Sequence, residues 1–261
     1  MQKIQLKLIS TLKISCIGLL LFFSLACQNQ QQKIVKISRE QLPIDKTIEK
    51  DVAVDSFIAP YRNSVNETMN EVLAYNKNYM VKSDGKRNTA IGNMMADIVL
   101  AEGDSIFYKR TGNHIDMVLL NHGGIRAPMQ KGDITRRTAF EIMPFENEIV
   151  VTELRAETIQ KMLVYLENAK KAHPVAGVQI ELDANQKVRR FLINQQPIDA
   201  QKTYFVATSD YLKNGGDRMY FFEEAKSVTT LDYKIRNAII YYFQKVDTVD
   251  YKQDNRFIIK P

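Results

Sequence analysis

Histidine and cysteine are scarce in this sequence, which argues against a site for two metal ions and against a disulfide framework. The 261 residues include three histidines, His114, His122 and His173, and no Asp-x-His or His-x-His pair. Two catalytic metal ions need several His and Asp ligands at set spacings. We therefore expect no dinuclear metal site and no cofactor in this chain. The two cysteines, Cys16 and Cys27, are too few for a disulfide framework.

An apolar run long enough to span a bilayer is also missing. Residues 14–26 are uncharged and mostly apolar, but a membrane-spanning helix needs about 20 apolar residues. Because Lys3, Lys7 and Lys13 precede this run, residues 1–26 are typical of a secretory signal peptide. The run ends at Ser-Leu-Ala-Cys, which resembles a bacterial lipobox with Cys27 as the lipidated residue. The alternative is an ordinary signal in which Cys27 is incidental.

Lipidation would place the protein in the cell envelope, held to a membrane by its anchor and by a tether over residues 27–54 that is rich in Gln and Asn at residues 28–32. After cleavage neither cysteine is free to form a disulfide, so the apolar core must hold the fold. The roughly 230 remaining residues suffice for one sizeable domain. We assign that domain to residues 55–261.

The sequence also lacks strongly basic segments. The formal charge of +6 includes three leader lysines and no leader acids, so 6 − 3 leaves +3 on the mature chain. No run of Lys or Arg exceeds two residues. The basic footprint of a nucleic-acid-binding protein is thus missing, and we expect no nucleic-acid partner.

Helices and strands both recur along the chain. Apolar residues at spacings of three and four predict an amphipathic helix over residues 55–76. Similar patterns predict helices over residues 89–102, 156–169 and 233–243, a polar loop over residues 103–113, and a helix-to-turn passage over residues 138–144. Short apolar runs predict strands over residues 117–120, 148–154, 178–182, 188–193 and 203–208. Residues 33–50 fit either a strand or a linker. This mixture indicates an α/β or α+β domain.

Three loop motifs carry the side chains that could bind a ligand. They are Asn-His-Gly-Gly-Ile-Arg at residues 121–126, Met-Pro-Phe-Glu-Asn at residues 143–147, and Tyr-Leu-Lys-Asn-Gly-Gly-Asp at residues 211–217. Paired glycines let a backbone adopt positive φ angles and approach a ligand closely. Each motif alone also fits an ordinary turn. Together they offer aromatic faces for a base, a carboxylate for ribose hydroxyls and cations for phosphate.

With these motifs, the sequence resembles the 5'-nucleotidases and their relatives, the UDP-sugar hydrolases and 2',3'-cyclic phosphodiesterases. The resemblance covers residues 55–259 and matches the C-terminal, substrate-binding domain of those enzymes. It includes Ala-Ile-Gly-Asn at residues 90–93 and Lys-Gly-Asp-Ile-Thr at residues 131–135. The resemblance implies mixed β-sheets covered by helices, in an α/β/β/α layering.

The resemblance also implies roles for particular residues. Phe145 and Tyr211 match two aromatic rings that clamp the base, and Asn121 matches an asparagine that hydrogen-bonds near it. Arg87 and Arg126 match arginines that face phosphate and ribose, and Asp217 matches the acid that accepts from ribose hydroxyls. The full implied set of substrate-binding residues is Arg87, Asn121, Gly123, Gly124, Arg126, Phe145, Tyr211, Asn214 and Asp217. His122 and Arg218 stand where the family commonly has glycine.

Hydrolysis in these enzymes depends on a metal-bearing N-terminal domain for which the sequence shows no motif. Gly-Asn-His at residues 112–114 matches a fragment of that domain, but none of its partner motifs is present. We therefore expect no catalytic residues here and no hydrolysis by this chain alone. One hypothesis is the binding half of a split nucleotidase, completed by a separately encoded metallophosphoesterase chain that carries the divalent metals. The alternatives are a stand-alone nucleotide-binding lipoprotein and a structural lipoprotein that has lost the ligand.

Overall fold

The structure, a computed structural model, describes residues 36–260. The predicted leader, Cys27 and the Gln-rich start of the tether lie outside the described residues. Residues up to Val52 and residues from Ala53 onward form two separate units. No helix or strand occurs between residues 36 and 51. Across residues 36–260, every helix is too short or too polar to cross a membrane.

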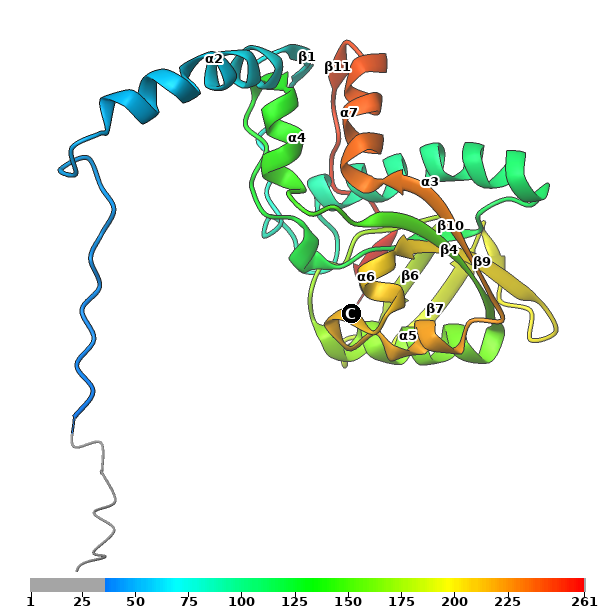
Figure 1. The fold of residues 1–261 in the computed structure, drawn as a ribbon. Helices are drawn as coiled ribbons and strands as arrows, with labels where there is room; N and C mark the ends of the chain where they lie inside the picture. The colour runs from blue at the N-terminus through cyan, green and yellow to red at the C-terminus, as the bar shows by residue number, and fades with distance from the viewer. Residues whose placement is uncertain (1–35, 261) are drawn as a thin grey trace, which may run out of the picture. The chain divides into compact units, whose positions relative to one another are not determined.

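A five-stranded mixed sheet forms the centre of the second unit (Figure 1). Its order is β10 (Ser227–Lys234), β4 (Glu148–Arg155), β9 (Thr203–Ser209), β2 (Met117–Leu119) and β5 (Val175–Ala176). β2 runs parallel to β9, and the other neighbours are antiparallel. Consequently the carboxyl ends of β2 and β9 and the amino end of β4 meet at one edge of the sheet.

The two faces of this sheet contribute to two apolar cores. Along β2, Met117 and Leu119 point into one core, whereas Val118 and the following residue, Leu120, point into the other. All four side chains are buried. This alternation follows from the two-residue period of a strand. It explains why the run is apolar without interruption, since a strand covered on both faces has no polar side.

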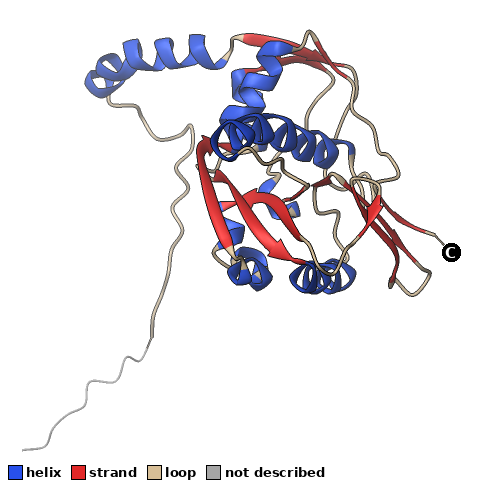
Figure 2. Ribbon diagram, turned by 90° about the vertical axis from the view of Figure 1, so that its right-hand side faces the viewer, coloured by secondary structure: helices blue, strands red, loops and turns tan. Residues whose placement is uncertain are grey.

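Helices cover both faces, with α3 on one side of the sheet and α5 on the other (Figures 1 and 2). The first core lies beneath α3 (Ala90–Thr111), α4 (Arg136–Ile142) and α7 (Ile235–Lys245). The second lies beneath α5 (Ala156–Ala169), whose buried residues include the predicted inward set, Ile159, Met162, Leu163 and Leu166. The mixed α/β class is confirmed.

Two smaller sheets complete the described strands. The four-stranded sheet packs on the second core in the order β12 (Phe257–Ile259), β6 (Val178–Leu182), β7 (Val188–Ile193) and β8 (Gln196–Pro197). The three-stranded sheet has the order β11 (Thr248–Val249), β1 (Val72–Asn76) and β3 (Gly132–Thr135). The remaining short elements are α6 (Asp210–Lys213), η1 (His122–Gly124), η2 (Gly216–Arg218) and η3 (Tyr220–Glu224).

The helix predicted over residues 55–76 is confirmed as far as Met69 and is wrong beyond it. Helix α2 spans Val52–Met69, and residues 72–76 form β1, which pairs with β3 and β11. Apolar spacing could not reveal partners that lie far away in the sequence. The apolar face of α2 is exposed, because none of its residues is buried.

The loop predicted over residues 103–113 is wrong as well, because α3 continues to Thr111. Gly103 packs against the core, where a Cβ atom would lie 3.3 Å from Ile115 Cδ1. Phe107 is buried one turn later. The helix ends where Gly112 adopts a φ of +75° and donates its N–H to the Tyr108 carbonyl, an ordinary glycine C-cap.

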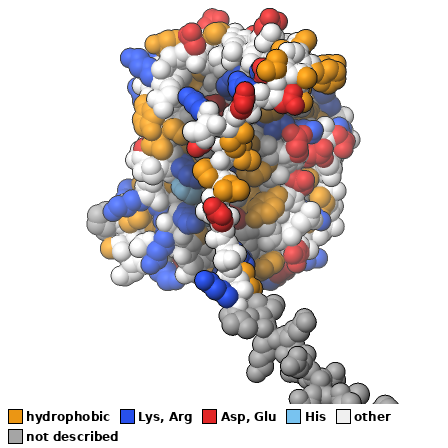
Figure 3. Space-filling view, turned by 60° about the vertical axis from the view of Figure 1, so that its left-hand side comes forward, with side chains coloured by type: hydrophobic (Ala, Val, Ile, Leu, Met, Phe, Trp, Pro, Cys, Tyr) orange, Lys and Arg blue, Asp and Glu red, His pale blue; other side chains and the backbone are white. Residues whose placement is uncertain are grey.

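The surface carries both charge signs. On the face drawn in Figure 3, basic and acidic side chains are interspersed with hydrophobic ones. The sequence as a whole likewise carries both signs, with 36 Lys and Arg against 30 Asp and Glu.

Candidate functional site

The edge where β2, β9 and β4 meet holds a pocket of about 360 Å³. Asn121 and η1 follow the end of β2, Phe145 and Asn147 precede β4, and Tyr211 and Asp217 follow β9. We call this the clamp pocket, and its lining residues are Asn121, Gly123, Gly124, Arg126, Phe145, Asn147, Tyr211 and Asp217. Seven of the nine residues implied by the family resemblance are therefore brought together.

Two aromatic rings line the clamp pocket and remain accessible. Phe145 is 39% exposed and Tyr211 is 47% exposed. The Arg126 guanidinium carbon lies 5.7 Å from the centroid of the Phe145 ring, which is within cation–π range. The buried guanidinium of Arg236 holds the loop that carries Phe145. Its Nη1 donates to the Phe145 carbonyl (3.1 Å), and its Nη2 pairs with Glu146.

Asp217 is held through both of its carboxylate oxygens and through its backbone. Its Oδ2 accepts from Asn121 Nδ2 at 2.7 Å, and its Oδ1 accepts from the Tyr211 hydroxyl at 3.1 Å. The Tyr165 hydroxyl donates to its backbone carbonyl at 3.0 Å. An ionised carboxylate has about four acceptor sites, so two remain open. The bonds hold the carboxylate in place and leave it able to accept two further donors.

Gly123 and Gly124 leave room for a neighbouring side chain, and their backbone conformation is not one that requires glycine. Neither Gly123 nor Gly124 has a positive φ angle, so the expectation of left-handed conformations there is wrong. A Cβ atom on Gly124 would lie 2.9 Å from Asn121 Oδ1, and one on Gly123 would lie 3.2 Å from Asn121 Nδ2. The absence of side chains at these positions lets the Asn121 amide fold back and reach Asp217.

Two implied residues lie elsewhere. Arg87 is buried, and its guanidinium donates to the carbonyls of Leu166 (2.6 Å) and Glu167 (3.0 Å) near the end of α5. It thereby satisfies carbonyls that the helix leaves unpaired, and it does not line the clamp pocket. Asn214 is exposed at the end of α6, where its Oδ1 accepts from Lys213 Nζ (3.2 Å).

One lining residue was missed by the sequence reasoning. Asn147 lies two residues after Phe145, within the Met-Pro-Phe-Glu-Asn motif, and lines the clamp pocket. Asn147 directly precedes β4, and in the sequence it is the last residue of that motif. A single asparagine before a strand also fits an ordinary turn, so the sequence offered no further signal.

Metal-binding geometry is not found in the described part of the chain. Within residues 36–260, no three His, Cys, Asp or Glu side chains are grouped so as to hold a metal ion. His114, in the Gly-Asn-His fragment, pairs with Asp104 through Nδ1 (2.8 Å) and stacks on Tyr108 with ring centroids 4.4 Å apart. This fragment begins with Gly112, the C-cap of α3.

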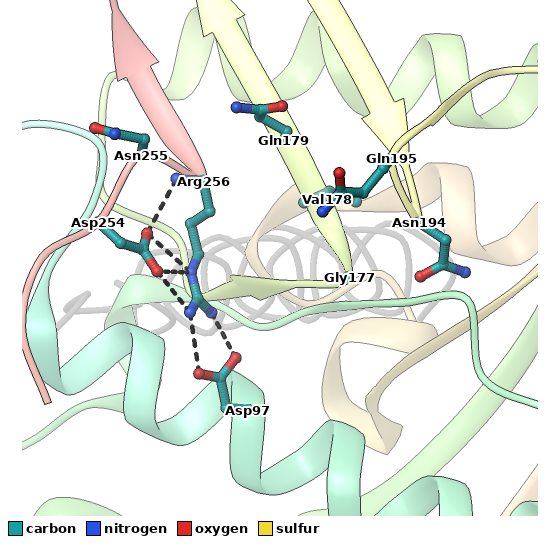
Figure 4. Close-up of a pocket in the computed structure, with 9 residues that line it drawn as sticks. All are labelled: Asp97, Gly177, Val178, Gln179, Asn194, Gln195, Asp254, Asn255 and Arg256. Atoms are coloured by element: carbon teal, nitrogen blue, oxygen red, sulfur yellow. Dashed lines mark hydrogen bonds and ion pairs between the residues drawn. The ribbon is translucent and has the colours of Figure 1, made fainter.

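A further polar cavity of about 500 Å³ shares no lining residue with the clamp pocket. In Figure 4 the Arg256 guanidinium points at the Asp97 carboxylate, with Asp254 beside it. Nη1 and Nη2 donate to Asp97 Oδ1 (2.5 Å) and Oδ2 (3.0 Å), and Nη2 lies 2.7 Å from Asp254 Oδ2. Because Asp97 belongs to α3 and Arg256 directly precedes β12, this network ties the helix to the four-stranded sheet.

Comparison with known proteins finds a family model and several relatives to which this chain is similar. A family model described as the 5'-nucleotidase C-terminal domain matches residues 64–224, more than half of the chain. The trifunctional nucleotide phosphoesterase protein of Bacillus subtilis (strain 168) is 30% identical over 212 residues, covering 74% of this chain and 14% of the relative. The 5'-nucleotidase of Rattus norvegicus is 24% identical over 201 residues, covering 67% and 34%.

Solved structures agree with this placement at the level of the fold. The 5'-nucleotidase precursor from Thermus thermophilus superposes with a TM-score of 0.67 at 24% identity, covering 81% of this chain and 44% of that one. The NAD nucleotidase of Haemophilus influenzae gives 0.59 at 17% identity, covering 81% and 42%. The chain spans less than half the length of each of these four relatives.

Proposed function

The chain belongs to the family of 5'-nucleotidase C-terminal domains, and on that premise we propose that its clamp pocket recognises a nucleoside or nucleotide. The observation that carries this proposal is the convergence of Phe145, Tyr211 and Asp217 in one pocket. Residues from three loops, separated by up to 96 positions, supply the groups that a nucleoside requires.

Each part of a nucleotide has a matching group in this arrangement. The rings of Phe145 and Tyr211 offer faces on which a base can stack. The two open acceptor sites of Asp217 suit the two hydroxyls of a ribose. Arg126 is exposed at the pocket and offers a cationic fork to phosphate. The volume of about 360 Å³ is at the small end of the range for ligand pockets, as suits a nucleoside.

We propose further that phosphate-ester hydrolysis is performed by a metallophosphoesterase chain that docks beside the clamp pocket. Supporting this idea, both clamp rings are more than one-third exposed, so a base bound between them would stay partly in water unless a second unit covered it. The described residues of this chain offer no metal-ligand group, so the divalent ions would be held by that partner. A lipid anchor on Cys27 would place the complex in the cell envelope.

Isothermal titration of AMP and adenosine into the full-length protein tests recognition. Base stacking contributes about 1–3 kcal/mol per base, so Phe145→Ala and Tyr211→Ala should each weaken binding by about 5- to 150-fold. Tyr79→Ala is the matched control, because Tyr79 is 56% exposed and lies outside the pocket. Equal affinities in the wild type and in both clamp variants would refute the proposal.

The proposed metallophosphoesterase partner is tested by measuring the phosphate-release activity that co-purifies with the chain, because capture of an unidentified protein would not identify it. A tagged full-length chain isolated from its native envelope at low salt should bring with it Mn²⁺-dependent phosphate release from AMP. A high-salt wash should remove this activity and leave AMP binding intact. Binding without any associated activity would instead identify a stand-alone binding lipoprotein. Activity that survives denaturing purification and refolding would show that this chain itself holds the metals.

A further inference from the structure

A second cavity of about 500 Å³ adjoins the clamp pocket. The two share Gly123 and Asp217 as lining residues. The clamp rings, Phe145 and Tyr211, line only the clamp pocket. The second cavity therefore borders the clamp pocket on its Asp217 side, away from the place proposed for the base.

Two cationic residues, Lys171 and Arg218, line this second cavity, and both are exposed. His122 also lines it, and its pKa is lowered mainly by burial and further by the charges of Lys82 and Lys171. Both lysines are thus close enough to act on the cavity wall. Asp217 is the one acid among the lining residues, and two of its acceptor sites are already occupied by Asn121 and Tyr211.

A buried imidazole forms part of the cavity wall. His173 is 4% exposed, and its Nδ1 accepts from the backbone N–H of His122 at 3.3 Å. Its Nε2 makes no hydrogen bond of standard geometry, although contact with the Leu120 backbone raises the pKa of the ring. Burial outweighs this contact and lowers the pKa of His173 to about 4, so the ring is neutral at pH 7.

The backbone at the boundary is held in an unusual conformation. Asp217 has a φ of +51° and Arg218 a φ of +63°. Residues with side chains seldom adopt this left-handed region. Of these two neighbouring residues, Asp217 lines both cavities and Arg218 lines only the second. Arg218 and His122 are also the two positions where the sequence departs from the glycines of the resemblance.

We propose that the second cavity is a ribose-edge subsite that receives a phosphate group carried on the 2′- or 3′-oxygen of the bound nucleotide. This inference rests on the proposed function, because the ribose hydroxyls are placed by their contact with Asp217. One hydroxyl remains on Asp217, and the substituent on its neighbour passes into the cavity. There Lys171 and Arg218 supply cationic donors for the phosphate oxygens. The ligand class is a nucleoside bisphosphate with a second, non-bridging phosphate at the ribose edge.

Titration of three ligands into the full-length protein tests the subsite. AMP is compared with adenosine 3′,5′-bisphosphate and adenosine 2′,5′-bisphosphate, which separate the two ribose positions. One charge-assisted contact at a partly exposed site should make one bisphosphate bind about tenfold more tightly than AMP. Arg218→Gly and Lys171→Gln should remove most of that advantage and leave AMP affinity unchanged. Arg218→Lys should retain part of it.

A matched control comes from the neighbouring residue. Lys170→Gln removes the same charge one position away, at an exposed residue that does not line the cavity, and should preserve the advantage. Bisphosphates that bind no more tightly than AMP would overturn the subsite and leave the proposed function intact. An advantage that Lys170→Gln reduces as much as Lys171→Gln would also overturn it. Failure of all three ligands to bind would overturn the proposed function and the subsite with it.

Discussion

Replacement of Asp217 by asparagine tests the proposed ribose contact. Asparagine preserves the size of the side chain, and the Asn121 amide can turn to bond with it, so the loop should keep its shape. Two acceptor sites of the carboxylate already serve Asn121 Nδ2 and the Tyr211 hydroxyl, which leaves two for the ribose diol. Changing two charge-assisted bonds to neutral ones costs about 1 kcal/mol each. Because Asp217 is exposed, we expect adenosine to bind about 10- to 30-fold more weakly.

The assay is a thermodynamic cycle between the substitution and the ligand. Adenosine and 2′,3′-dideoxyadenosine are titrated into the wild type and into Asp217→Asn, with thermal melting to confirm that both are folded. The loss should appear with adenosine and be nearly absent with the dideoxy compound, which has no diol to bind. If both ligands lose the same affinity, the carboxylate acts on the shape of the pocket and the reasoning about the diol is refuted.

Two further predictions concern stability. Asp97→Asn removes the charge opposite Arg256, whose side chain is 17% exposed. The free energy of unfolding should fall by about 2 kcal/mol and the Tm by about 4–8 °C, with no change in AMP affinity. An unchanged Tm would contradict the structural role of the pair. The pKa of His173 is lowered from 6.5 to about 4 by burial, so between these values the unfolded chain binds the extra proton and stability falls as the pH falls. Urea titrations should show about 2 kcal/mol less stability at pH 5 than at pH 7, and His173→Gln should largely abolish this difference; an equal drop in that variant would assign the effect to other groups.

Local patterns predicted the parts of the fold that a single segment determines. The bounds of α5, β6 and β7 agree with the residues predicted from their apolar patterns, and β2, β4 and β9 differ by one residue at one end. In these segments the apolar period and the buried face agree, as α5 illustrates with its four predicted core residues. Strand β10, by contrast, was not predicted, because its eight residues are mostly polar and only Leu231 is buried.

Other elements depend on contacts that no local pattern contains. Residues 72–76 continue the apolar spacing of α2 but become β1, because β3 and β11 supply backbone partners about 60 and 175 residues away. Gly103 argued for a loop, although tight packing against Ile115 makes glycine suitable inside α3. In both cases tertiary contacts outweighed the local preference.

The candidate site shows the same division. The motifs predicted which side chains gather, since they lie at strand ends that the sheet brings to one edge. Arg87 was assigned by resemblance alone, and its burial beneath the end of α5 could not be read from its neighbours in the sequence. The hydrogen bond between Asn121 and Asp217, 96 residues apart, could likewise be known only from the fold.

The most direct test of the account is a calorimetric titration of AMP into the purified full-length protein, with phosphate release measured in parallel with and without Mn²⁺. The account predicts saturable binding that Tyr211→Ala weakens, and no phosphate release from the chain alone under either condition. Absence of binding would contradict recognition at the clamp pocket. Metal-dependent release that persists through repurification would contradict the separation of recognition from catalysis.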